Sequence, residues 1–423
     1  MLLLQTLRTQ KDFVIDRLKI KNFKDLSLVD KILDIDEKRR KVQTQYEELL
    51  AKINAASKEI GKLMASGQKE DAERIKQEVL QYKESTQRLT KELEELEKQQ
   101  YESLVLLPNL PHSSVPKGVS TEDNEVVRSG NDIPNLDEKA LPHWELCNQY
   151  QLIDFELGTK ITGAGFPVYK NKGAKLQRAL INYFLDYNIQ AGYTEYQPPI
   201  LVNTDSAYGT GQLPDKEGQM YHATVDDFYL IPTAEVPLTN FYRDEILKES
   251  DLPLKLTAYT PCFRREAGSY GKDVRGLNRL HQFDKIEIVR FAHPDTSYDA
   301  LEEMVLHVEK LIQNLGLPYR ILRLCGGDMS FASALTYDFE VFSAAQKRWL
   351  EVSSVSNFET FQTNRMKIRF KNADGKTQLV HSLNGSSLAL PRIVACMLEN
   401  NQTENGIKIP DVLVPYFGAE WIN

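Results

Sequence analysis

Hydrophobic residues recur at alternating steps of three and four positions in two runs near the start of the chain, and only Arg39 interrupts the first run. This spacing is the heptad pattern of coiled-coil helices. Gly67 and its polar neighbours separate the runs and suit a tight reversal. Two matched helices joined by a short turn cover each other's apolar stripes by lying antiparallel, which predicts a hairpin about 45 Å long at roughly 1.5 Å per residue. The heptad positions are Ile32, Ile35, Val42, Tyr46, Leu49, Ile53, Ala56, Ile60 and Leu63, then Ile75, Val79, Tyr82, Thr86, Leu89, Leu93 and Leu96.

The hairpin has two possible uses. Coiled coils commonly serve self-association, although a hairpin that closes on itself has less need of a partner. The exposed flank includes the basic run "EKRRK" at residues 37–41. Such a run is usually a solvated face, but on a protruding arm it can also contact phosphates. The sequence leaves both uses open.

The remainder of the chain has a different pattern. Residues 106–144 are rich in proline and polar residues and predict a linker. Beyond them, a helical pattern at 174–189 and short β-type runs at 285–291 and 366–370 follow one another irregularly. We therefore expect an α+β fold with a mostly antiparallel β-sheet flanked by helices, in a chain of two or three domains.

Composition excludes several classes of protein. A content of 41% hydrophobic and 26% charged residues is normal for a soluble globular protein, and the formal charge of −8 argues against a generally basic nucleic-acid binder. The four cysteines lack the spacing of a zinc site and fit reduced thiols. No apolar run approaches the length needed to span a membrane, so we expect a cytoplasmic protein without a membrane anchor.

The stretch "CFRREAGSYGKDVRG" at 262–276 concentrates charge and glycine. The flanking segments 255–266 and 278–291 predict antiparallel strands, so residues 267–276 become their connection. Strand alternation places Arg264 and Glu266 on one face and Arg265 on the other, and it places Phe283, Lys285 and Glu287 on a common face. If the two faces coincide, they offer a guanidinium, carboxylates and an aromatic plane, which together suit a nucleotide. The alternative is a solvated hairpin whose ion pairs each contribute at most about 1 kcal/mol.

Two later segments add to this set. Residues 379–400 predict a strand, a turn of small residues and a helix carrying Arg392. In "RWLEVSSVSN", Glu351, Ser353 and Ser354 supply a carboxylate and two hydroxyls that could bind a divalent cation and phosphate oxygens. Each residue alone is equally consistent with an ordinary surface position. The two common nucleotide motifs, GxxxxGK[ST] and a strand-anchored GxGxxG, are absent from the sequence.

Several segments in order resemble the bacterial-type seryl-tRNA synthetases, which are class II aminoacyl-tRNA synthetases. Residues 167–202 resemble motif 1, with its proline at Pro199; residues 261–289 resemble motif 2, and residues 379–402 resemble motif 3. "YGTGQLP" and "LIPTAEVPLTN" are typical of the serine enzymes. The resemblance covers essentially the whole chain and is strongest from about residue 165 onward.

The resemblance implies roles for individual residues in binding ATP and Mg²⁺. Arg264 would hold the α-phosphate and Glu266 the adenine amine. Phe283 and Arg392 would stack on the adenine ring. The implied catalytic residues are Arg264, Arg392 and Glu351, and the implied Mg²⁺ ligands are Glu351 and Ser354. The full implied ATP set is Arg264, Arg265, Glu266, Leu280, Phe283, Glu351, Val352, Ser353, Ser354 and Arg392.

The resemblance also implies the substrate. L-serine would lie among Thr233, Ala234, Glu235, Arg264, Glu287, Asn384 and Ser386. The connection at 267–276 would close over ATP and then meet the acceptor end of tRNA. Ser387 stands where the family usually has glycine, and Pro391 precedes Arg392 where a small residue is usual. Because proline is tolerated early in a helix, we expect Arg392 to keep its direction.

The implied function is that of a homodimeric serine–tRNA ligase. It would activate L-serine with ATP and Mg²⁺ and transfer it to tRNA(Ser), and also to tRNA(Sec) where that tRNA is present. The implied domains are a tRNA-binding domain with its coiled-coil arm at 1–105 and a catalytic domain at 106–423, with a linker at about 106–143. Two alternatives remain: a synthetase-like ligase that loads an amino acid onto a carrier protein, and a non-enzymatic coiled-coil adaptor. The adaptor predicts loss of Arg264, Glu266 or Arg392, and all three are present.

Overall fold

The chain forms two compact units. The computed structural model describes residues 1–215, 217–267 and 275–423. One unit comprises residues 1–19 and 23–108, and the other comprises residues 20–22 and 109–423.

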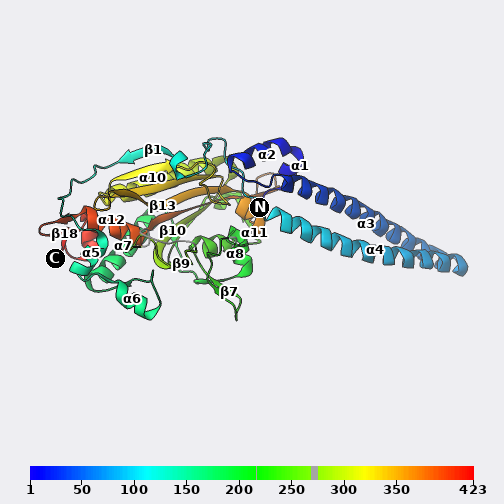
Figure 1. The fold of residues 1–423 in the computed structure, drawn as a ribbon. Coiled ribbons are helices and arrows are strands. Elements are labelled where there is room, and N and C mark those ends of the chain that lie inside the picture. The colour runs from blue at the N-terminus through cyan, green and yellow to red at the C-terminus, as the bar shows by residue number, and fades with distance from the viewer. Residues whose placement is uncertain (216, 268–274) are drawn as a thin grey trace. The chain divides into compact units, whose positions relative to one another are not determined.

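The N-terminal unit contains the predicted hairpin. Helices α3 (Ser27–Ala65) and α4 (Lys69–Leu104) run side by side (Figure 1). Val42 of α3 packs against Leu89 and Leu93 of α4, with Tyr46, Leu49 and Leu96 around them, so the heptad prediction is confirmed. Gly67 in the connection has a φ of 80°, a conformation that glycine adopts without steric cost. Two shorter helices, α1 (Leu4–Thr9) and α2 (Lys11–Ile20), precede the hairpin.

A buried carboxylate joins three helices of this unit. Asp36 of α3 is fully buried and accepts hydrogen bonds from Arg8 Nε at 2.7 Å, Arg40 Nε at 3.0 Å and Gln100 Nε2 at 3.2 Å. Burial alone would raise the pKa of Asp36, but the bonds from Arg8 and Gln100 hold it below its ordinary value. Arg39, which interrupts the heptad, lies 3.7 Å from the same carboxylate. The break in the hydrophobic pattern therefore marks a buried ionic cluster.

The second unit is built on an eight-stranded sheet, which confirms the predicted α+β fold. The strand order is β1-β11-β12-β13-β16-β10-β9-β4, and all neighbours are antiparallel except β4 and β9. The strands are β1 (Glu125–Gly130), β11 (Tyr319–Arg323), β12 (Leu335–Ser343), β13 (Arg348–Glu359), β16 (His381–Ala389), β10 (Gln282–Ala292), β9 (Leu254–Phe263) and β4 (Thr194–Glu195). Strand β1 lies inside the segment predicted as a linker, which is therefore partly a sheet edge.

Helices pack on both faces of this sheet, and the face that carries the site combines polar residues with a second hydrophobic cluster that includes Val289, Phe291 and Leu238 of α9 (Glu235–Asn240). Ile286 and Ile288 of β10 join the hydrophobic core formed with α7 (Asn171–Gln190), α10 (Ser297–Asn314) and α12 (Leu390–Asn400). Alternation then directs Glu287, between the two isoleucines, to the opposite face. The helix predicted at 174–189 is confirmed as α7.

Smaller elements surround the sheet. The helices are α5 (His143–Gln149), α6 (Phe155–Ile161), α8 (Thr204–Thr210), α9 (Glu235–Asn240), α11 (Phe361–Met366) and α13 (Val414–Phe417). The strands are β2 (Ile153–Asp154), β3 (Val168–Tyr169), β5 (Leu201–Asn203), β6 (His222–Ala223), β7 (Phe228–Leu230), β8 (Ile246–Lys248), β14 (Arg369–Lys371), β15 (Thr377–Leu379), β17 (Gln402–Thr403), β18 (Gly406–Lys408) and β19 (Trp421–Ile422). The run predicted as a strand at 366–370 is wrong in its first half, because α11 extends to Met366.

The turn predicted within residues 379–400 is also wrong. Strand β16 is continuous from His381 to Ala389, so Asn384, Gly385 and Ser386 lie within it. A Cβ on Gly385 would approach Val355 Cγ2 to 2.7 Å. The glycine is therefore needed for the close approach of β16 to β13.

Candidate active site

The β9–β10 hairpin places Arg264 and Phe283 on one face, so the condition set for a nucleotide site in the sequence analysis is met. Phe283 is paired with Cys262, and the backbone N–H of Arg264 donates to His281 O at 2.9 Å, which continues the pairing one residue beyond β9. The Arg264 guanidinium lies over the Phe283 ring, 5.2 Å from its centroid. A cation and an aromatic face therefore share the same side of the hairpin.

Strand alternation does not place Glu266. Strand β9 ends at Phe263, and Glu266 has a φ of 50° in the left-handed region. Its carboxylate instead lies 3.2 Å from Arg279 Nη1. Arg265 is exposed, and its backbone N–H donates to Gln219 O. Of the connection predicted at 267–276, residues 268–274 lie outside the described residues.

A buried polar cluster lies beside this hairpin. Lys285 Nζ donates to Thr233 Oγ1 at 2.9 Å and lies 2.6 Å from Glu287 Oε2, and Thr233 Oγ1 donates to the same carboxylate at 3.1 Å. Ser386 of β16 is paired directly with Glu287. Thr233, Glu287 and Ser386 were predicted to surround the substrate. The sequence analysis did not predict that Lys285 holds Thr233 and Glu287.

Glu235 belongs to the same cluster, and its pKa is raised. It follows Ala234 at the start of α9, and Gln362 Nε2 donates to its Oε1 at 2.6 Å. Burial, reinforced by the negative charge of Glu287, raises the pKa of Glu235 to about 7; Gln362, Lys285 and Asn384 oppose this. Hence Glu235 can be protonated or ionised near neutral pH.

A second group of oxygen atoms lies on β12 and β13. Asp338 is paired with Ser354, and Glu340 with Glu351, because a bulge at Val352 shifts the register. Asp338 and Glu340 share a face, so their partners Ser354 and Glu351 share it too, although simple alternation would separate them. Burial and the negative charge of Glu351 raise the pKa of Asp338, while a hydrogen bond from Ser354 opposes the rise.

Ser353 does not belong to this group, contrary to the prediction. Its hydroxyl is buried and donates to Ser386 O at 2.6 Å. The bulge turns it away from Glu351, so only one of the two predicted hydroxyls is available. Sequence spacing could not show the bulge, because a bulge depends on the pairing of two strands.

Arg392 lies between β13 and the segment before β10. Pro391 is in the first turn of α12, and Arg392 donates from Nη1 to Glu351 O at 2.6 Å and from Nε to Asn278 O at 3.1 Å. The proline is tolerated there, as expected. Ser387 lies on β16, and its hydroxyl donates to the buried Asn188 Oδ1 at 2.9 Å.

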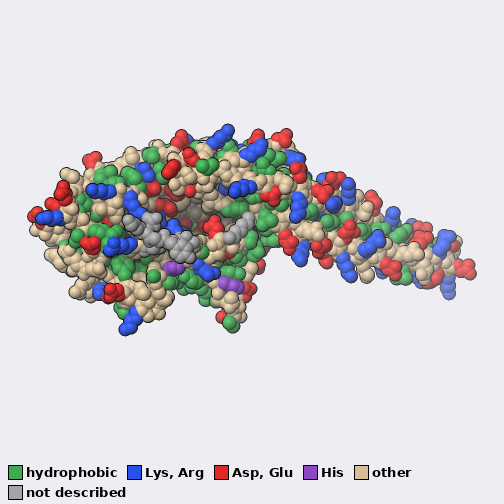
Figure 2. Space-filling view, viewed as in Figure 1, with side chains coloured by type: hydrophobic (Ala, Val, Ile, Leu, Met, Phe, Trp, Pro, Cys, Tyr) green, Lys and Arg blue, Asp and Glu red, His purple; other side chains and the backbone are tan. Residues whose placement is uncertain are grey.

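The visible face of the larger unit is hollowed (Figure 2). Figure 2 shows acidic and basic side chains gathered around this hollow. In the part of the chain that the structure describes, no three His, Cys, Asp or Glu side chains cluster as a metal site. None of the described helices combines the length and apolar character that a membrane crossing requires.

Comparison with known proteins decides the family. Residues 1–111 match the model of the seryl-tRNA synthetase N-terminal domain, and residues 220–401 match that of the class II tRNA synthetase core domain (G, H, P, S and T). The chain is 52% identical to a serine–tRNA ligase of Salinibacter ruber over 420 residues, covering 99% of this chain and 98% of that protein. The chain belongs to the seryl-tRNA synthetase family. It is a class II aminoacyl-tRNA synthetase with serine–tRNA ligase activity.

Two further relatives agree. The synthetase is 47% identical over 392 residues to a serine–tRNA ligase of Geobacter sulfurreducens, covering 91% of this chain and 92% of that protein. The crystal structure of seryl-tRNA synthetase from Pyrococcus horikoshii complexed with ATP has a TM-score of 0.92 and 33% identity, covering 99% of each chain. A carrier-protein ligase is not favoured, since the synthetase retains the N-terminal domain of the serine enzymes.

Sequence reasoning missed three residues of the site. Lys285 was seen on the correct face but given no role, and Gln362 and Asp338 were not considered. Lys285 lies on a predicted strand near a predicted ligand, so strand alternation was a usable signal for it. Asp338 lies on β12, a strand that the sequence analysis did not predict. Gln362 lies on α11, and no local pattern connects it to Glu235.

Proposed function

We propose that this synthetase binds ATP across the β9–β10 hairpin and L-serine in the adjacent polar cluster. The observation that carries the proposal is the position of Arg264 over Phe283, beside the group formed by Thr233, Glu235 and Glu287. The resemblance to the ATP complex of the Pyrococcus horikoshii enzyme supports it. Glu266, Leu280 and Arg392 belong to the same ATP site.

The first chemical step needs no general base. An oxygen of the serine carboxylate attacks the α-phosphorus, the bond from that phosphorus to the bridging oxygen breaks, and pyrophosphate leaves. In the second step the terminal ribose hydroxyl of tRNA takes the seryl group and AMP leaves. Arg264 holds the reacting phosphate and stabilises its charge, while Arg392, stacked on the adenine, orients ATP and adds positive charge to the site. The chain therefore contributes orientation and electrostatics.

The serine site is polar because serine carries an ammonium and a hydroxyl. The ionised forms of Glu235 and Glu287 attract the ammonium, and Thr233, Asn384 and Ser386 offer hydrogen bonds to the remaining polar atoms. A site of buried polar groups rejects alanine, since their hydrogen bonds would be left unmade. Lys285 holds Thr233 and Glu287 in place.

The group on β12 and β13 fits Mg²⁺. Asp338 Oδ1 is buried and has no hydrogen-bond partner among the described residues. Together with Glu351 and Ser354 it supplies the oxygen donors that Mg²⁺ prefers. When bound there, the ion neutralises negative charge on the phosphates of ATP.

The arm is the proposed contact for tRNA, within a domain at residues 1–105, while residues 106–423 form the catalytic domain. A rigid hairpin recognises a long RNA arm through its shape and backbone. Lys38 and Lys41 of the basic run form exposed ion pairs with Asp34 and Glu37 at 2.7 and 2.6 Å. Such pairs are weak and exchange readily for phosphate contacts. The proposal includes tRNA(Ser), and tRNA(Sec) where present, a homodimer and a cytoplasmic location.

Serine-dependent ATP–pyrophosphate exchange tests the site. Arg264→Ala should lower the exchange rate by about 10²–10³-fold, as expected for the loss of one preorganised electrostatic partner. Arg369→Ala, on the surface strand β14, is the matched control and should exchange normally. Near-normal exchange by Arg264→Ala would contradict the assignment. Charging assays with tRNA and with a carrier protein then identify the acceptor.

A further inference from the structure

A buried histidine and glutamate are linked through hydrogen bonds to Arg392, the residue proposed to stack on adenine. His143 opens α5 and Glu399 lies near the end of α12, and both side chains are fully buried. His143 Nδ1 and Glu399 Oε1 are 2.7 Å apart, and the backbone N–H of His143 donates to the same oxygen at 2.9 Å. The steps described above use neither residue.

The hydrogen bonds determine which form the histidine takes. The backbone N–H of Leu277 donates to His143 Nε2 at 2.8 Å, so Nε2 is an acceptor. Nδ1 must then carry the proton and donate it to Glu399. The imidazole therefore connects the buried carboxylate of Glu399 to the backbone of residues 275–278.

The same carboxylate holds a second connection to this segment. Gln346 Nε2 donates to Glu399 Oε1 at 2.9 Å, and Asn278 Nδ2 donates to Gln346 Oε1 at 3.0 Å. Ser343 also donates to Glu399. Burial would raise the pKa of Glu399, but its bonds with His143 and Ser343 hold it below the ordinary value, so the acceptor is ionised.

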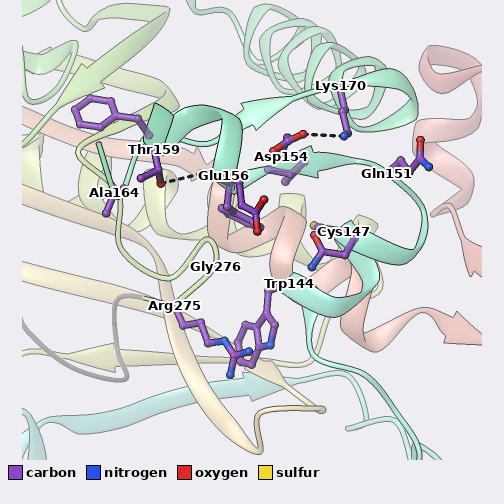
Figure 3. A pocket seen from close by; sticks show the side chains of 15 residues that line it. Trp144, Cys147, Gln151, Asp154, Glu156, Thr159, Ala164, Lys170, Arg275 and Gly276 are labelled. Atoms are coloured by element: carbon purple, nitrogen blue, oxygen red, sulfur yellow. Dashed lines mark hydrogen bonds and ion pairs between the residues drawn. The ribbon is translucent and has the colours of Figure 1, made fainter. Parts of the chain in front are cut away.

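The end of the connection fits this arrangement sterically. Gly276 has a φ of 66°, and a Cβ there would lie 2.2 Å from His143 Nε2. Arg275 lies over the ring of Trp144, 4.7 Å from its centroid. Figure 3 shows this pair and Gly276 at the edge of a cavity of about 550 Å³. Residues 275–278 are thus held by side chains of α5 and by the network behind them.

The segment in turn holds Arg392. Asn278 O accepts from Arg392 Nε, and Arg392 lies on the same helix as Glu399, seven positions earlier. Seven residues are close to two helical turns, so both side chains leave one face of α12. At one end of this face is Arg392, which is proposed to stack on adenine. At the other end is Glu399, which holds Asn278 through Gln346, and the carbonyl of Asn278 accepts the bond from Arg392.

We propose that His143 and Glu399 are positioning residues for ATP: they fix residues 275–278, and through Asn278 they fix the Arg392 guanidinium. The inference rests on the proposed ATP site. It predicts a defect in the use of ATP that leaves serine binding intact, because no hydrogen bond or ion pair among the described residues joins the network to the cluster around Glu287. A merely structural pair would change stability without this selectivity.

Two substitutions separate the bonds of His143. In His143→Asn the amide nitrogen takes about the place of Nδ1 and can still donate to Glu399, but nothing accepts from Leu277. In His143→Gln the amide oxygen can reach the place of Nε2 and restore that acceptor. His222→Asn, at an exposed histidine of β6, is the control.

Hydrogen exchange and pyrophosphate exchange give the readouts. We expect His143→Asn to speed amide exchange at Leu277 at least tenfold. Its kcat/KM for ATP should fall by about 10–10², the scale of a small misplacement of a binding group, with less than a twofold change in the KM for serine. His143→Gln should recover most of both effects. The proposal would be overturned if His143→Asn showed wild-type amide exchange at Leu277 together with a wild-type kcat/KM for ATP. It would also be overturned if the variant raised the KM for ATP and the KM for serine equally.

Circular dichroism shows whether His143→Asn folds. If it does not fold, a second variant tests the proposal. Gly276→Ala leaves the buried pair intact and pushes the segment away from His143, so it should show the same selective ATP defect. Normal use of ATP by Gly276→Ala would overturn the proposal. If the wild type shows no serine-dependent exchange, the proposed function fails, while exchange at Leu277 still decides whether His143 holds the segment.

Discussion

Replacing Glu235 with glutamine should remove a pH dependence from the stability of this synthetase. Glu235 is 8% exposed and lies near a second carboxylate, Glu287. Its folded pKa of about 7 compares with an ordinary value of 4.5. Glutamine keeps the shape of the side chain and can still accept the bond from Gln362, but it does not titrate.

The sign of the effect follows from proton binding. Between pH 4.5 and about 7 the folded protein binds the Glu235 proton more tightly than the unfolded chain does. The free energy of unfolding therefore falls as the pH rises through this range. At about 1.4 kcal/mol per pH unit, the wild type should lose roughly 3 kcal/mol that Glu235→Gln retains.

Urea unfolding of the two proteins at several pH values from 4.5 to 8 measures this loss. Glu245→Gln, at an exposed acid, is the control and should follow the wild type. The stability difference between the wild type and Glu235→Gln should grow in favour of the variant up to about pH 7 and then stay constant. Parallel curves at all pH values would refute the reasoning, since they would mean that Glu235 titrates normally in the folded protein.

The same titration should appear in serine binding. The ionised carboxylate attracts the substrate ammonium, so the KM for serine of the wild type should fall as the pH rises through about 7. Glu235→Gln should bind serine more weakly and without this pH dependence. An unchanged pH profile in the variant would assign the dependence to another group.

Two further predictions concern the cation group and the arm. Asp338→Asn should raise the Mg²⁺ concentration needed for half-maximal pyrophosphate exchange by about tenfold or more, since a coordinating charge is lost; an unchanged Mg²⁺ requirement would exclude Asp338 as a ligand. Asp36→Asn should destabilise the N-terminal unit by about 3 kcal/mol, because it breaks a buried ionic cluster. Hydrogen exchange of α3 and α4 in the full chain should then be faster while serine activation stays normal; unchanged exchange of these helices would show that the cluster is not stabilising.

Much of the site was predictable because strand alternation is a local property. Alternation sorted the side chains of each strand, and the structure shows that the faces of Arg264 and Phe283 coincide, with the guanidinium over the ring. The prediction failed for Glu266, because β9 ends three residues earlier. It failed for the Ser353 hydroxyl because a bulge reversed the alternation. Spacing predicts a side chain's direction only while the strand remains regular.

The sequence by itself determined the coiled-coil arm and the antiparallel hairpin of the site, since both depend on contacts between residues close in the chain. The tertiary structure decided which distant groups meet. Gln362 reaches Glu235, Asp338 faces Ser354, and His143 bonds to Leu277 only because strands and helices far apart in the chain pack together. Such contacts depend on strand register and helix packing, which arise from the whole core.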